Sequence, residues 1–198
     1  MIILDAEFTG LDPHKHSLIS LGAFEFEKPE NQIYLECLPW EGAEIMDDAL
    51  EVNGFTEERI FSSHKTLELA MIEFDKWSQG VGEHTLAGQN VGHLDLMFLQ
   101  TSFERYGMSF KFPHRTIDAH TLTYMHLIKR GEKPPMENER TAINSSFVQE
   151  YVGIPEEPKP HNALNGAKVA GEAISRLLYG KNLLTEFENF PIPEYLLN

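Results

Sequence analysis

The sequence has one cysteine, no long apolar run, and fewer basic than acidic residues. Because Cys37 alone cannot form an internal disulfide, it fits a reducing compartment, and we expect a cytoplasmic protein. The apolar runs fall far short of the ~20 residues that a transmembrane helix needs. Asp5 and Glu7 interrupt the apolar stretch near the start, which argues against a secretory signal. We therefore expect no membrane partner.

The shortage of positive charge limits the nucleic-acid partners. With 16 Lys and Arg against 31 Asp and Glu, the net charge of −15 argues against coating long nucleic acid by neutralising many phosphates. Residues 1–99 carry 5 basic and 19 acidic side chains, whereas residues 103–133 hold six basic ones, which either track a few phosphates or form a solvated helix face. A hydrophobic content of 41% over 198 residues indicates one globular domain spanning residues 1–198.

Hydrophobic periodicity predicts strands in the first half of the chain and mostly helices in the second. The expected strands are residues 2–8, 18–26, 32–38, 85–89 and 115–117. The expected helices are residues 66–77, 94–106, a helix capped by Asp118, 145–152 and 162–178. This order predicts an α/β fold with a mixed five-stranded sheet flanked by helices. The proline-rich residues 153–160 are expected to form a rigid loop between helices.

The first candidate for chemistry is the segment DAEFTGLD at residues 5–12. Asp5 and Glu7 alternate along a strand, so both carboxylates point to one face and repel each other unless a cation lies between them. Magnesium or manganese suits such oxygen ligands. The simpler alternative is an acidic strand end that faces solvent.

Two further segments supply an acid and a base. Asp95 lies within an apolar helical run, where an unpaired carboxylate is costly to bury. His161 follows the proline-rich loop at the start of a helix, and a histidine that titrates near neutrality suits general-base work. Taken singly, Asp95 on an exposed helix stripe and His161 as a surface residue are the simpler interpretations.

Taken together, the three segments resemble the DEDDh 3′→5′ exonuclease family, which includes proofreading exonucleases, oligoribonucleases and ribonuclease T. The residues that match its motifs are Asp5, Glu7, Thr9, Gly10, Asn90, Asp95, His161 and Ala163. The resemblance implies a ribonuclease H-like fold over nearly the whole chain. One position departs from the pattern, because the family places a metal-binding Asp five residues after the His, where this chain has Gly166.

The resemblance also implies roles for individual residues. Asp5, Glu7 and Asp95 would bind a pair of Mg²⁺ or Mn²⁺ ions, and His161 would be the catalytic base. The implied substrate-binding residues are Phe8, Thr9, Leu11 and Asn90, although Leu11 is equally well explained by simple packing.

Two functions remain open at this stage. The first is a metal-dependent 3′→5′ exonuclease that releases nucleoside monophosphates from the 3′ ends of single-stranded or short DNA or RNA. The second is a catalytically degenerate relative that binds a nucleic-acid end or a protein partner without cleaving, which Gly166 motivates. The sequence allows a homodimer without requiring one.

Overall fold

A five-stranded mixed sheet forms the centre of the computed structural model, which describes residues 1–157 and 161–197. The strands, in chain order, are β1 (Ile2–Phe8), β2 (Leu18–Glu25), β3 (Lys28–Glu36), β4 (Leu86–Gly88) and β5 (Ile117–Asp118). Strands β1 to β3 form an antiparallel meander, while β4 runs parallel to β1 and to β5. The spatial order is β3-β2-β1-β4-β5, which confirms the predicted mixed five-stranded sheet.

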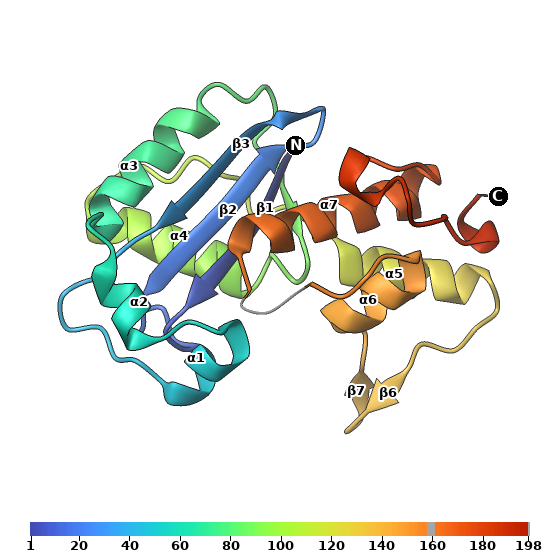
Figure 1. Cartoon of the computed structure of the whole chain (residues 1–198), viewed down its shortest axis with the longest axis horizontal. Helices are drawn as coiled ribbons and strands as arrows, with labels where there is room; N and C mark the ends of the chain where they lie inside the picture. Colours follow the sequence, from blue (N-terminus) through green and yellow to red (C-terminus); the bar gives the residue numbers. More distant parts are fainter. Residues whose placement is uncertain (158–160, 198) are drawn as a thin grey trace.

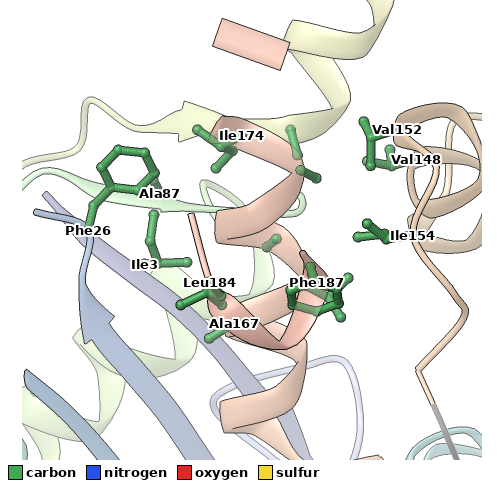
Figure 2. Close-up of a cluster of buried hydrophobic side chains, with 14 of the residues drawn as sticks. Ile3, Phe26, Ala87, Val148, Val152, Ile154, Ala167, Ile174, Leu184 and Phe187 are labelled. Atoms are coloured by element: carbon green, nitrogen blue, oxygen red, sulfur yellow. The ribbon is translucent and has the colours of Figure 1, made fainter. Parts of the chain in front are cut away.

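Helices cover both faces of this sheet (Figure 1). They are α3 (Leu67–Ser78) and α4 (Leu94–Arg105) on one face, and α5 (Ala119–Lys129), α6 (Ser145–Val152) and α7 (Ala163–Tyr179) on the other. Because both faces of β1 are covered, it buries consecutive apolar side chains: Ile2 and Leu4 face α3 and α4, and Ile3 faces α7. Figure 2 shows the apolar core between the sheet and helices α5 to α7, where Ile3 of the sheet and Ile174 of α7 belong to one cluster.

A missing side chain sets how closely α7 approaches the sheet. A Cβ atom at Gly22 of β2 would lie 2.1 Å from the backbone nitrogen of Leu164, in the first turn of α7. Gly22 is the partner of Asp5 in the β1–β2 pairing. The glycine therefore lets the start of α7 contact the sheet directly beside the strand position that carries Asp5.

Arg176, which forms a buried ion pair within α7, connects this helix to the end of α6 and the segment that follows it. Arg176 and Glu172 are both fully buried, and Nε of the arginine donates to Oε1 of the glutamate at 2.8 Å. The guanidinium also donates to the carbonyl oxygens of Val152 and Gly153, at 2.9 and 3.3 Å. The loop that begins at Gly153 is thus anchored at its start. Its residues 153–157 contain no helix or strand, and residues 158–160 lie outside the described residues.

Several smaller elements lie outside the sequence expectations. They are helices α1 (Asp47–Asn53) and α2 (Glu57–Ser62), the short strands β6 (Met136–Glu137) and β7 (Arg140–Thr141), and the 3₁₀ turns η1 (Thr185–Phe187) and η2 (Glu194–Leu196). The expected cap of α5 is confirmed, because Oδ1 of Asp118 accepts a hydrogen bond from the backbone of His120 at 2.9 Å. Within residues 1–157 and 161–197, no helix is long and apolar enough to cross a bilayer.

Candidate active site

Two carboxylates lie side by side at the end of the central strand. Asp5 and Glu7, both half-buried, line an open groove of about 650 Å³ next to α1 and α4. The same two residues line a smaller cavity of about 180 Å³ against α6 and α7. Strand alternation explains why both face one way, since residues two apart share a face. The pair therefore stands where the groove and the cavity meet.

Asp95, which belongs to α4, lines the same groove. It lies in the first turn of α4, is only 7% exposed, and lines the groove with Asp5 and Glu7. Its position shows that the exposed-stripe interpretation of this acid is wrong. Among the described residues, its buried Oδ1 atom has no hydrogen-bond partner. A buried carboxylate oxygen with no donor is costly, which makes it a natural ligand for a cation.

His161 lines the cavity together with Asp5 and Glu7. Its backbone nitrogen donates to the carbonyl oxygen of Asn53, at the end of α1, at 3.1 Å. The Asn53 side chain is buried, and its Nδ2 donates to the carbonyl oxygen of Phe8 at 3.1 Å. Through these two hydrogen bonds, Asn53 connects the end of β1, the end of α1 and His161.

Burial, and after it mutual repulsion, raises the pKa values of these carboxylates. Burial, followed by the charge of Glu157, raises the pKa of Asp5 to about 8. Burial and the neighbouring charges, first that of Asp5, raise the pKa of Glu7 to about 9. Burial and the charge of Asp5 also hold the pKa of Asp95 well above its usual range. Without a cation, these acids keep protons at neutral pH instead of ionising together.

The donor set fits hard divalent ions, although it is not closed around one. In the part of the chain that the structure describes, no three His, Cys, Asp or Glu side chains already form a ready-made metal-binding group. Like charges are expected to stay apart until a cation draws them together. Magnesium and manganese prefer oxygen ligands, which are provided by Asp5, Glu7 and the unpartnered Oδ1 of Asp95.

The departure at Gly166 has a clear structural counterpart. A Cβ atom at this position of α7 would lie 2.2 Å from Oδ2 of Asp5, so the Asp5 carboxylate occupies the space where a side chain would begin. The neighbouring Asn165 is exposed and is absent from the lining of the cavity. Neither residue places an oxygen ligand in the cavity.

Glu157 is a site residue that sequence reasoning missed. It is half-buried, lines the cavity with Asp5 and Glu7, and its charge raises the pKa of both. Its Oε1 accepts a hydrogen bond from the backbone nitrogen of Asn162 at 3.1 Å. A glutamate in a proline-rich, acidic loop looks like a solvated residue in the sequence, so no pattern separated it from its neighbour Glu156.

Three of the four expected substrate residues line the groove. Phe8 stacks on Phe98 of α4, with ring centroids 4.1 Å apart and planes inclined by 23°. Leu11 is 67% exposed at the groove, so simple core packing does not explain it. Asn90 is also exposed there, with a φ of 56° that asparagine adopts more readily than most residues.

Thr9 takes a different place, because it is fully buried and does not line the groove. Its hydroxyl donates to the carbonyl oxygen of Glu44 at 2.7 Å and accepts from the backbone of Ser17 at 2.9 Å. Its carbonyl oxygen accepts from the backbone of Met46, a residue of the groove wall, at 2.8 Å. In this structure, Thr9 acts on the groove by positioning that wall.

Comparisons with known proteins agree with this geometry. The model of an exonuclease family, RNase_T, matches residues 2–173. Among solved structures, the nuclease domain of 3′hExo, a DEDDh family member bound to rAMP, has a TM-score of 0.68 at 16% identity, over 98% of this chain and 95% of that chain. Cell-death related nuclease 4 (CRN-4) has a TM-score of 0.71 at 14% identity, over 91% of this chain and 64% of that chain.

Exonuclease I of E. coli in complex with a dA16 oligonucleotide has a TM-score of 0.70 at 14% identity, over 91% of this chain and 40% of that chain. The chain therefore spans less than two thirds of the length of CRN-4 and of Exonuclease I. No curated protein sequence matches. At these identities the solved structures show a shared fold, whereas the family model covers most of the sequence. The chain belongs to the DEDDh exonuclease family.

Proposed function

We propose that this protein is a 3′→5′ exonuclease that depends on Mg²⁺ or Mn²⁺ and releases nucleoside monophosphates from the 3′ ends of single-stranded or short nucleic acid. One observation carries the proposal. Asp5 and Glu7, Asp95, and His161 come from three distant segments, yet they line one groove and its adjoining cavity. A set of acids beside one histidine matches the needs of phosphodiester hydrolysis better than those of a structural surface.

The chain's own residues would divide the work as follows. Asp5, Glu7 and Asp95 would hold two divalent ions, which supply charge neutralisation for the attacking and leaving oxygens of the phosphodiester. His161 lines the cavity with Asp5, where it would accept the proton of the attacking water. Asn53 would act as a positioning residue, because it fixes the backbone of His161 relative to the end of β1.

The groove favours a short grip on the substrate. Phe8, Leu11, Met46 and Val52 give its wall apolar surface against which terminal bases would stack, and such stacking is worth roughly 1–3 kcal/mol per base. The net charge of −15 disfavours binding that relies on many phosphate contacts. Solved structures of relatives with rAMP and with dA16 support a nucleotide or single strand as the occupant.

The test uses oligonucleotides labelled at the 5′ end, in both DNA and RNA forms, with Mg²⁺ or Mn²⁺. The expected product is a ladder that shortens from the 3′ end, with mononucleotides released. The matched control is the double variant Asp5→Asn, Glu7→Gln, which keeps side-chain size but removes both charges. Absence of shortening by excess wild-type protein, or equal shortening by the control, would overturn the proposal.

A second candidate function is supported by Gly166, which leaves the last acidic position of the family empty. On this account the protein binds nucleic-acid ends without cleaving them. Wild-type protein would then bind a labelled oligonucleotide but not shorten it, and Gly166→Asp would restore cleavage. Strong cleavage by wild-type protein would eliminate this candidate.

A further inference from the structure

The empty position at Gly166 raises the question of what completes the acidic site. We propose that Glu157 supplies the missing carboxylate and binds a divalent ion in place of a side chain at position 166. This inference rests on the proposed function, since it concerns the metal ions of the same site. It assigns a ligand role to a residue that lies outside the motifs of the family.

The position of Glu157 is the first support. Glu157 and Gly166 line the same cavity, together with Asp5, Glu7 and His161. The side chain that position 166 lacks and the side chain that Glu157 provides would therefore reach the same group of acids.

The fixation of Glu157 is the second support. Its backbone nitrogen donates to Oε1 of the buried Gln149 in α6 at 3.0 Å, and its own Oε1 accepts from the backbone of Asn162, the N-cap of α7, at 3.1 Å. Arg176 fastens the start of the same loop through the carbonyl oxygen of Gly153. These contacts hold the glutamate in place, and a ligand that is already held loses less entropy when it binds an ion.

The space around Gly166 is consistent with this replacement. The Asp5 carboxylate lies where the Cβ of residue 166 would be, with Oδ2 only 2.2 Å from that point. An aspartate at position 166 therefore requires the Asp5 side chain to move. With glycine at 166, Asp5 keeps its place and a carboxylate enters the cavity from the loop instead of from α7.

A separate observation distinguishes this site from an ordinary acidic patch. Oδ1 of Asp95 is buried without a hydrogen-bond partner in the described structure, at the groove that Asp5 and Glu7 also line. Protein atoms bury this oxygen, so bulk solvent does not neutralise it as it would an exposed carboxylate. An unpartnered oxygen beside other acids points to a cation as the missing partner.

The test measures ion binding directly, so it does not depend on cleavage. The 198-residue chain is titrated with MnCl₂ at pH 8, and bound ions are counted by calorimetry and by the loss of the free Mn²⁺ electron paramagnetic resonance signal. We expect two ions in wild-type protein. In Glu157→Gln, the second ion should be lost or weakened at least tenfold. The matched control is Glu156→Gln, which removes the same charge from the exposed neighbour and should bind both ions as wild-type protein does.

A rescue variant completes the design. Adding Gly166→Asp to Glu157→Gln should restore the second ion, because the carboxylate returns from α7. Glu157→Ala, a loop substitution outside both cores, should lose the ion as Glu157→Gln does. Two ions bound to Glu157→Gln at wild-type affinity, or fewer than two bound to wild-type protein, would overturn the inference. Two ions bound without any cleavage would instead overturn the proposed function and leave the ligand role of Glu157 standing.

Discussion

The burial and mutual repulsion of the carboxylates make a direct prediction about stability without metal. The perturbation is a rise in pH from 5 to 9 in the presence of EDTA. In the unfolded chain, Asp5 and Glu7 ionise near pH 3.8 and 4.5, whereas in the folded protein their pKa values are raised to about 8 and about 9. Between these limits the folded protein holds protons that the unfolded chain releases. The stability that these two groups contribute is therefore fully present below their unfolded pKa values, is lost as the pH rises through this window, and changes no further above about pH 9.

The magnitude follows from proton linkage. Each proton held only by the folded state lowers the free energy of unfolding by about 1.4 kcal/mol per pH unit. Between pH 5 and 7, one such carboxyl group therefore removes about 3 kcal/mol, a large share of the roughly 5–15 kcal/mol that stabilises a typical protein. Saturating Mn²⁺ should flatten the profile, because the ions replace the protons in the folded state.

The assay is urea unfolding followed by the fluorescence of Trp40 and Trp77, at pH 5, 6, 7, 8 and 9, with EDTA or MnCl₂. The control is Asp5→Asn, Glu7→Gln, which should be more stable than wild-type protein at pH 8 in EDTA and respond little to pH or Mn²⁺. Constant or increasing wild-type stability from pH 5 to 8 in EDTA would refute the reasoning, as would an equal slope in the control.

Three further predictions concern single side chains. His161→Ala should bind Mn²⁺ normally but cleave roughly 10²–10⁴-fold more slowly, as expected for a lost general base. Calorimetry and turnover measured on one preparation check this, and unchanged turnover contradicts it. Gly22→Ala should lower the free energy of unfolding by about 1–3 kcal/mol and reduce cleavage, because the new methyl group would lie 2.1 Å from the backbone nitrogen of Leu164. A urea midpoint at or above that of wild type would show that α7 does not need this close approach. Asn53→Ala should lower the free energy of unfolding by about 1–3 kcal/mol, because it leaves the Phe8 carbonyl oxygen unpaired. It should also lower kcat more than it alters Mn²⁺ affinity. A stability loss with wild-type kcat per folded molecule would contradict its positioning role.

The sheet and the long helices could be predicted because their periodicity is carried by many residues. The strand expected at residues 2–8 is observed as Ile2–Phe8, and the helix expected at 145–152 as Ser145–Val152. The strand expected at 32–38 is instead Lys28–Glu36, because β3 lies at the sheet edge with a single buried position and gives a weak apolar pattern.

The short elements were missed for a related reason. Helices α1 and α2 contain seven and six residues, too few for a helical repeat to show. Tertiary contacts hold them in place, such as the hydrogen bond of Asn53 to Phe8 and the packing of Leu50 and Ile60 in one apolar cluster. The turn between β6 and β7 has Asn138 and Glu139 at φ values of 47° and 64°. Glycine usually marks such turn positions in a sequence, and here a glutamate stands at one of them, so the turn could not be recognised.

In the candidate site, the sequence could predict residues whose type is unusual for their surroundings. Asp95 in an apolar helix is one, and the spaced pair Asp5 and Glu7 is another. Glu157 could not be predicted, because its role depends on the loop anchored by Arg176 and on the space left by Gly166. Such cooperation between distant segments appears only once the chain is folded.

The central claim is that acids from distant segments meet to hold divalent cations at the end of β1. The most direct test is a crystal structure of the protein soaked with MnCl₂ and a nucleoside 5′-monophosphate, with the ions located by anomalous scattering. The account predicts two manganese peaks contacting Asp5, with Glu7, Asp95 and Glu157 among their ligands and the phosphate beside His161. A map without manganese at Asp5 would contradict it.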